Sequence, residues 1–235
     1  SLIFALVSIT FLANQVATGL AVGILSLGVS ALIGKKYESL TISAPKPIFI
    51  AELSEIPLIG PVFFQQNIVV YGAILLAVLI AFCLNKTRLG LAIRACGENP
   101  KAAEALSYSV WKIRYGAVAF GGMMAGFAGA YASTVYTPLW ADGMIAGRGW
   151  IAVALVVFGT WKTSRIFLGA YLFGMVTLGE LVVQSLGFAV PSQFLTAMPF
   201  VITIVVLAII SADMTRLRLH APYSLGETYD GSEPR

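Results

Sequence analysis

Side chains that could carry out catalysis are few and scattered in this sequence of 235 residues. His220 is the single histidine, so neither a histidine-based metal cluster nor a Ser-His pair can form within the apolar segments. Cys83 and Cys96 lie 13 positions apart, a spacing typical of neither a metal site nor a disulfide framework. We therefore expect no catalytic residues, no metal and no other cofactor in this chain.

Lys162 and Thr163 resemble the end of a phosphate-binding loop, in which a glycine precedes the lysine. Here Trp161 stands in place of that glycine, and the earlier glycine of the motif is also absent. We therefore expect the chain neither to bind nor to hydrolyse ATP by this route. Any energy from ATP must enter through a partner.

Four residues within apolar runs could contact a polar solute. Asn14 and Gln15 lie in the middle of the first run, Glu180 is the single carboxylate well inside a run, and Trp150 could stack on a base or a sugar face. Polar groups in hydrocarbon need partners. The alternative for Asn14 and Gln15 is hydrogen bonding between helices. The alternative for Glu180 is pairing with another helix or a position near the outer interface.

A polar stretch from Asn85 to Arg114 separates two strongly apolar runs. Within it, Asn99-Pro100 followed by Lys-Ala-Ala-Glu-Ala-Leu predicts a short helix. Asn99 can cap its first free amides, and Pro100 occupies a position where its missing N–H costs nothing. A short capped helix with small side chains suits contact with another protein, and the alternative is a solvated helix at the membrane surface. The basic residues of the stretch are Lys86, Arg88, Arg94, Lys101, Lys112 and Arg114.

The composition indicates a membrane protein. Hydrophobic residues make up 58% of the chain and charged residues 11%, whereas soluble domains are about half apolar and about a quarter charged. Several runs approach or exceed the roughly 20 residues that cross a bilayer. We predict an all-α, polytopic integral membrane protein. The net charge of +4 follows from basic loops, so no nucleic-acid partner is expected.

About six crossings are predicted within a transmembrane domain over residues 1–212, followed by a polar tail over 213–235. The first run, residues 1–33, is longer than one straight crossing and is therefore tilted, broken, or joined to the end of an earlier helix. The fourth run is brief and indicates a discontinuous helix of the kind that lines cavities in transporters. The predicted crossings after the first are 66–84, 115–137, 145–161, 166–186 and 194–211, with an outer loop over 34–65.

The third crossing carries glycines at helical spacing. Such a surface is typical of close packing against another helix, within the subunit or across a dimer. A role in lining a pathway is the alternative. These glycines are Gly121, Gly122, Gly126 and Gly129.

The basic residues also predict the orientation. Eleven of the 15 Lys and Arg residues fall in 85–114, 161–165 and the tail, and the other four fall in the opposite loops. By the positive-inside rule, the polar stretch and the C-terminus are cytoplasmic. The predicted location is the bacterial cytoplasmic (inner) membrane, where the chain contacts lipid.

Several stretches resemble a known family. Residues 87–103, TRLGLAIRACGENPKAA, followed by a glycine-rich crossing, resemble the cytoplasmic coupling loop of ABC importer permeases of the branched-chain amino acid, ribose and simple-sugar group. Residues 136–140 (YTPLW), 143–152 (GMIAGRGWIA) and 221–226 (APYSLG) resemble permeases for nucleosides or simple sugars that work with a lipoprotein receptor of the basic-membrane-protein type. Ser107-Tyr108-Ser109 departs from the Gly-Ile/Val-Asn-like turn that is more common in relatives. Subunits of the family are usually longer, so we expect an N-terminal set of helices to be missing here.

The resemblance implies specific partners. These are two ABC ATPase subunits, a second permease that is identical or homologous, and an extracytoplasmic substrate-binding lipoprotein. The stretch from Glu98 to Leu106 would dock in a groove on the ATPase, and its alanines would let the partner approach the helix backbone closely. The residues expected to couple permease and ATPase are Glu98, Asn99, Pro100, Ala102, Ala103 and Glu104.

Three alternatives remain open. The same architecture could serve branched-chain amino acids, ribose or another pentose. An ion-coupled secondary transporter or channel would need no ATPase, and its uptake would survive ATP depletion. A purely structural membrane subunit would cause no transport defect when deleted. The coupling-loop motif favours the ABC permease over the last two.

Overall fold

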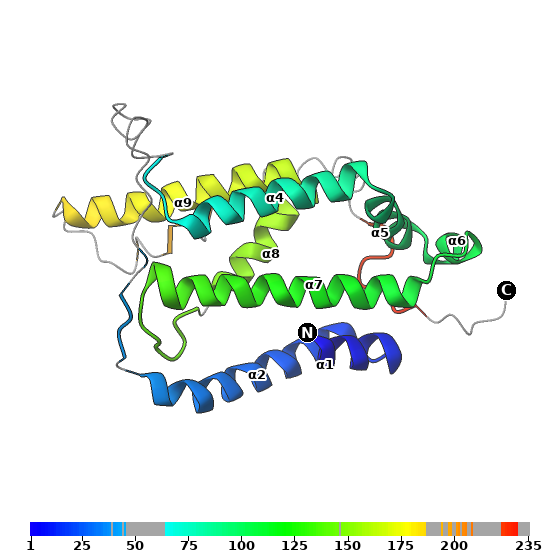
Figure 1. Cartoon of the computed structure of the whole chain (residues 1–235), viewed down its shortest axis with the longest axis horizontal. Coiled ribbons are helices and arrows are strands. Elements are labelled where there is room, and N and C mark those ends of the chain that lie inside the picture. Colours follow the sequence, from blue (N-terminus) through cyan, green and yellow to red (C-terminus); the bar gives the residue numbers. More distant parts are fainter. Residues whose placement is uncertain are drawn as a thin grey trace. The chain divides into compact units, whose positions relative to one another are not determined.

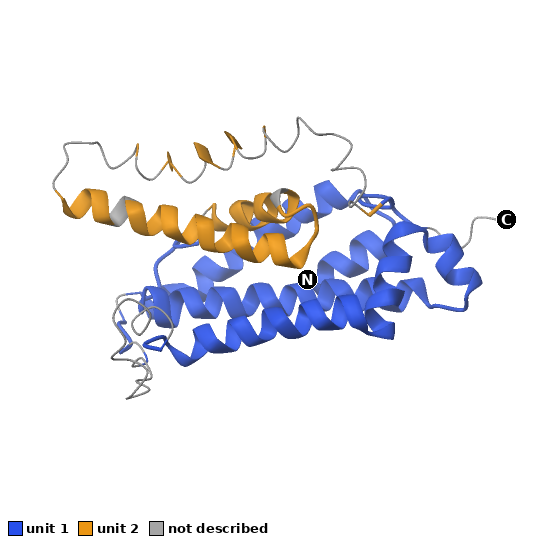
Figure 2. Ribbon diagram, turned by 90° about the horizontal axis from the view of Figure 1, so that it is seen from above, with its two compact units in different colours: residues 1–145, 223–235 blue, residues 146–222 orange. Residues whose placement is uncertain are grey.

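The computed structural model is helical over most of the part of the chain that it describes (Figure 1). The described residues are 1–38, 40–43, 45, 64–145, 147–186 and 222–229, with isolated positions between 194 and 208. Over these residues there is no strand, only two isolated bridges, and the all-α prediction is confirmed. The chain divides into two compact units (Figure 2).

Unit 1 comprises Ser1–Ile145 and Tyr223–Arg235, and unit 2 comprises Ala146–Pro222. The helices of unit 2 are α8 (Arg148–Phe158) and α9 (Thr163–Ser185). The long helices of unit 1 are α2 (Gln15–Gly34), α4 (Ile68–Lys86) and α7 (Val110–Tyr131). Its shorter helices are α1 (Leu2–Ala5), η1 (Leu6–Thr10), η2 (Lys35–Tyr37), α5 (Arg88–Glu98), α6 (Pro100–Ala105) and η3 (Ala132–Tyr136).

The first apolar run is broken between η1 and α2. Leu12 has a left-handed backbone, with φ 53°. The side-chain oxygen of Asn14 accepts hydrogen bonds from the amides of Val16 at 3.0 Å and Ala17 at 3.1 Å. An uncapped helix start in hydrocarbon would leave these amides without partners. Asn14 and Gln15 therefore lie at the start of α2, and the first run is broken just before them, which is one of the three predicted alternatives.

Four helices of the described chain are long and apolar enough to cross a membrane. They cover Gln15–Tyr37, Ile68–Lys86, Val110–Tyr136 and Thr163–Ser185. These agree with four predicted crossings. α8 has only 11 residues, so it spans about 16 Å at the usual helical rise. Most of the predicted crossing over 194–211 and most of the loop over 34–65 lie outside the described residues.

The end of α2 meets the segment after η3 through Gly34 and Trp140. A Cβ atom at Gly34 would lie 1.9 Å from the Trp140 ring, so the indole occupies the space that any side chain would need. Two isolated bridges join Glu38 to Trp140 and Thr41 to Leu139. These contacts tie the segment after α2 to the segment after η3.

Other segments of unit 1 pack against the glycine-rich helix α7. α1 packs against α7, and a Cβ atom at Gly122 would lie 2.2 Å from the side chain of Ser1. The Thr10 and Tyr115 hydroxyls share a hydrogen bond of 2.6 Å between η1 and α7. Part of the predicted glycine surface is therefore covered by close packing within the chain.

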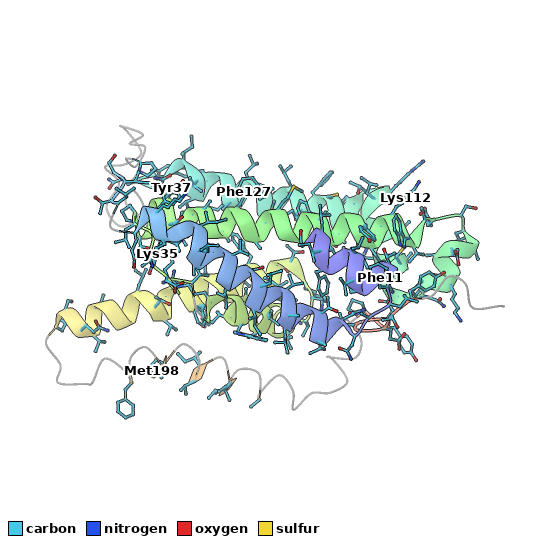
Figure 3. All side chains as sticks on the ribbon, turned by 90° about the horizontal axis from the view of Figure 1, so that it is seen from below. Phe11, Lys35, Tyr37, Lys112, Phe127 and Met198 are labelled. Carbon is cyan, nitrogen blue, oxygen red and sulfur yellow. The ribbon has the colours of Figure 1, made fainter. Side chains whose placement is uncertain are left out.

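Large apolar side chains are exposed both on the long helices and in the turns beside them. Phe11 is 69% exposed and Phe127 is 67% exposed (Figure 3). A soluble monomer rarely exposes apolar surface on this scale. Lipid or another membrane subunit would cover such side chains, which agrees with the predicted membrane location.

Candidate functional site

The candidate site is the corner formed by α5 and α6 between the spans α4 and α7. The turn into α5 is set by Thr87, whose hydroxyl donates to the carbonyl oxygen of Cys83 at 2.6 Å and accepts from the amide of Gly90 at 3.2 Å. A Cβ atom at Gly90 would lie 2.3 Å from the same Cys83 oxygen. The close approach of the two backbones therefore requires glycine, and it fixes how α5 leaves α4.

α6 has the start that the sequence predicts. The Asn99 side chain accepts a hydrogen bond from the amide of Ala102 at 3.0 Å, and Pro100 lies in the first turn. The helix ends after Ala105, because Ser107 adopts a left-handed backbone with φ 67°. The amide of Ser107 donates to the carbonyl oxygen of Glu104 at 2.8 Å. α6 is thus a six-residue helix with hydrogen bonds at both ends.

The three alanines of α6 differ in how far they are buried. Ala103 is 1% exposed and packs with Cys96 and Val110 in a small buried cluster. Ala102 and Ala105 are exposed, and their spacing of three residues puts them on one helix face. The methyl group of Ala103 therefore seats α6 on its own chain, while Ala102 and Ala105 present the small surface that a partner could approach.

The C-terminal segment, residues 222–229, completes the corner, and no role was predicted for it. The amide of Ser224 donates to the carbonyl oxygen of Gly97 in α5 at 3.0 Å, and its hydroxyl donates to the same oxygen at 2.5 Å. Tyr229 packs against the cluster of Cys96, Ala103 and Val110, and its hydroxyl donates to the Glu104 carboxylate. Figure 1 shows this segment, in red, between α5 and the start of α7.

Arg114 and Gln15 hold the middle of the C-terminal segment. The Arg114 guanidinium donates to the carbonyl oxygen of Glu227 at 3.2 Å, and it lies 5.5 Å from the centre of the Tyr229 ring. The side-chain amide of Gln15 donates to the same Glu227 oxygen at 3.3 Å. The start of α2 and the start of α7 therefore meet at one backbone carbonyl.

The electrostatics of the corner are mainly basic. Burial raises the pKa of the Cys96 thiol, and the positive charge of Arg114 opposes this shift. The acidic side chains of α5 and α6 are Glu98 and Glu104, and both are exposed. The exposed basic residues around them are Lys86, Arg88, Arg94, Lys101 and Lys112.

The four predicted pathway residues fall in different places. Asn14 caps α2, and Gln15 contacts the C-terminal segment. Trp150 lies in the first turn of α8 and is 71% exposed. Glu180 belongs to α9, but its side chain lies outside the described residues. Across the described chain, no group of three or more His, Cys, Asp or Glu residues could hold a metal ion.

Comparison with known sequences identifies the family. Residues 1–211 match the family described as branched-chain amino acid transport system / permease component. The chain is 36% identical to a Haloferax volcanii protein provisionally named the glucose ABC transporter permease TsgC13, over 97% of this chain and 76% of that protein. No solved structure gives a significant match.

Two further relatives carry nucleoside names. The chain is 39% identical to the nucleoside ABC transporter permease NupC of Lactococcus lactis, over 67% of this chain and 50% of NupC. It is 34% identical to the guanosine ABC transporter permease NupQ of Bacillus subtilis, over 88% of this chain and 67% of NupQ. The chain therefore spans between half and about three quarters of these three relatives.

Proposed function

Because the chain belongs to the branched-chain amino acid transport system / permease component family, we propose that it is the permease of an ABC importer for a nucleoside or a simple sugar. The names of the three relatives support this cargo class. Branched-chain amino acids remain the main alternative cargo, since the family carries that description. The importer would work in the cytoplasmic membrane.

The observation that carries the proposal is the construction of α6. This short helix is capped by Asn99, closed at Ser107 and seated by Ala103, while Ala102 and Ala105 remain exposed. Small side chains let a partner reach a helix backbone closely. A helix fixed on one side and open on the other suits a rigid contact with an ATPase, and we call α6 the coupling helix.

The proposed importer contains further subunits. Two ATPases would dock on the coupling helix of this chain and of a second permease, and a lipoprotein would deliver substrate outside. The excess of basic residues around the corner supports a cytoplasmic position for α5 and α6. The hydrogen bonds of Ser224 to Gly97 place the C-terminal segment at the same corner, which supports a cytoplasmic C-terminus.

ATP would be hydrolysed by the ATPases, because the chain lacks a phosphate-binding loop. Closure of the ATPase pair would move the coupling helix as a lever. α4 and α7 flank the corner directly, so their spans would tilt and change access from one side of the membrane to the other. Glu98, Asn99 and Glu104 would supply polar contacts at the edge of the docking surface.

The proposal also includes a substrate pathway through the membrane. Trp150 could stack on a base or a sugar ring, and Glu180 and the polar start of α2 at Asn14 and Gln15 are the other predicted contacts. Trp150→Ala should weaken uptake while Trp150→Phe retains most of it. Equal uptake by both variants and the wild type would remove Trp150 from the pathway.

The docking surface is tested by Ala102→Arg, because Ala102 is exposed and a long charged side chain would hold the ATPase away from the helix. Ala102→Ser is the matched control, since it keeps a small side chain at the same position. We expect Ala102→Arg to lose at least roughly tenfold in uptake and in co-purified ATPase, with normal membrane insertion. Unchanged uptake by Ala102→Arg would contradict docking on this face.

The energy source is tested separately. An ABC importer stops when ATP is depleted and continues when the membrane potential is collapsed at constant ATP. An ion-coupled transporter shows the opposite pattern. The same assay with labelled guanosine, glucose and leucine assigns the cargo class.

A further inference from the structure

The C-terminal segment touches elements that are far from it in the sequence. Ser224 bonds to Gly97, which is 127 residues away, and Gln15 bonds to Glu227, which is 212 residues away. Tyr229 reaches the coupling helix at Glu104. One segment of eight residues therefore contacts α5, α6, α7 and α2.

The contact with α5 satisfies a group that the helix cannot satisfy alone. The last four carbonyls of a helix have no partner within it, and Gly97 is the penultimate residue of α5. Ser224 supplies two donors to this carbonyl, and the residue is itself only 9% exposed. This pairing would be absent if the segment were a loose tail.

The contact with the coupling helix covers its buried face. Tyr229 packs on the cluster of Cys96, Ala103 and Val110, and its hydroxyl bonds to Glu104. Without this ring, the coupling helix would be held by its contacts with α5 and α7 and by the turn at Ser107. The C-terminal segment thus adds a further attachment.

The contact at Glu227 brings α2 to the corner, although α2 does not neighbour α5 or α6 along the chain. Arg114 of α7 and Gln15 of α2 both donate to the Glu227 carbonyl oxygen. A displacement of the coupling helix would therefore reach α2 through the C-terminal segment, as well as α4 and α7 through the chain. Coupling between distant sites requires a continuous set of contacts of this kind.

We propose that Ser224 and Tyr229 are positioning residues that hold the coupling helix in place and link its movement to α2. This inference rests on the proposed function, because it assigns the coupling helix to energy transfer. It gives the C-terminal segment a role in the efficiency of transport rather than in the recognition of cargo.

The docked position is tested first through Cys96, which Tyr229 helps to cover. The full-length permease in membranes, with Cys83→Ser to remove the other thiol, is labelled with N-ethylmaleimide. Tyr229→Ala should label Cys96 at least about fivefold faster, the factor that corresponds to one lost contact of ordinary strength. Tyr223→Ala is the matched control, because Tyr223 belongs to the same segment and is 82% exposed.

The positioning role is tested next by the ratio of substrate imported to ATP hydrolysed. Tyr229→Phe keeps the packing and removes the hydroxyl that bonds to Glu104. In proteoliposomes with the ATPases and the receptor, this ratio should fall by about threefold to fivefold, as for one lost hydrogen bond. Tyr223→Phe should retain the wild-type ratio. A merely structural effect would change the amount of inserted protein and leave this ratio unaltered.

The outcomes separate the two proposals. ATP-dependent uptake by the wild type, with a wild-type ratio in Tyr229→Phe or unchanged Cys96 labelling in Tyr229→Ala, overturns the positioning role alone. Absence of ATP-dependent uptake in the wild type overturns the proposed function and the positioning role with it. Faster labelling together with a lower ratio supports both.

Discussion

The carbonyl oxygen of Gly97 accepts two hydrogen bonds from the single residue Ser224, one from its amide at 3.0 Å and one from its hydroxyl at 2.5 Å. A helix end is thereby closed by a residue that is 127 positions away in the sequence. Capping residues at helix C-termini usually come from the next few positions. This distant closure fixes the C-terminal segment against α5.

Removing the Ser224 hydroxyl should loosen that attachment. Ser224→Ala leaves the amide bond in place and removes one donor, at a cost of about 1 kcal/mol. Amide hydrogen exchange of residues 222–229 should then be about fivefold faster. Ser224→Thr keeps a hydroxyl donor and should exchange at close to the wild-type rate. Equal exchange in Ser224→Ala and the wild type would show that the hydroxyl contributes nothing.

The cap of the coupling helix gives a second prediction. Asn99→Ala leaves the first amides of α6 without their side-chain acceptor and should destabilise this helix by about 1 kcal/mol. Limited proteolysis between residues 98 and 106 should accelerate, and uptake should fall with it. Asn99→Asp retains an acceptor oxygen and should behave like the wild type. A cleavage rate unaffected by Asn99→Ala would rule out the cap as a source of order.

The long spans were predictable because the bilayer imposes a simple constraint. A helix must keep about 20 apolar residues in hydrocarbon, so the apolar runs predicted α4 and α9 to within a few residues. Asn14 was less predictable. An amide side chain in an apolar run gives the same sequence pattern whether it caps a helix or bonds to another helix. The left-handed backbone at Leu12 and the hydrogen bonds that Asn14 accepts show that a helix begins there.

The corner was predictable only in its local parts. Asn99 and Pro100 start α6 through residues that are close to them in the sequence. The start of α6 could therefore be predicted from residue types alone. The burial of Ala103 did not, because it depends on Cys96, Val110 and the distant Tyr229. Three similar alanines give no indication of which one faces inward. Contacts over more than 100 residues leave no trace in local patterns.

Gly34 should not tolerate even the smallest side chain. A Cβ atom there would lie 1.9 Å from the Trp140 ring, and overpacking of this kind costs about 1–3 kcal/mol. Gly34→Ala should therefore lower the unfolding temperature in detergent micelles, and the additional change Trp140→Ala should relieve the clash. Gly28→Ala is the control, since nothing lies within 4 Å of its Cβ position. Similar unfolding temperatures for the two Ala variants would contradict the close packing.

The reactivity of Cys96 should depend on pH in a defined direction. Burial raises the pKa of its thiol from the ordinary value of 9.0, and the thiolate is the form that maleimides attack. A raised pKa means less thiolate at any given pH, so labelling should still be rising above pH 9.0. Deleting residues 222–235 hydrates the thiol, lowers its pKa towards the ordinary value and shifts the rate profile to lower pH. Identical profiles with and without these residues would show that the C-terminal segment does not cover Cys96.

The turn after the coupling helix gives the last prediction. Ser107 has φ 67°, a conformation that costs an ordinary side chain about 1–2 kcal/mol and a β-branched one more. Ser107→Gly should therefore raise the unfolding temperature in detergent, whereas Ser107→Val should lower it and reduce uptake by moving the end of α6.

The matched control for this turn is Ser109→Val. Ser109 has φ −77° and ψ 90°, an extended backbone that β-branched residues adopt readily. If Ser107→Val and Ser109→Val lower the unfolding temperature equally, the left-handed backbone at Ser107 does not end the coupling helix. If only Ser107→Val does so, the helix owes its length to this turn, and the angle at which it meets an ATPase depends on a single backbone conformation.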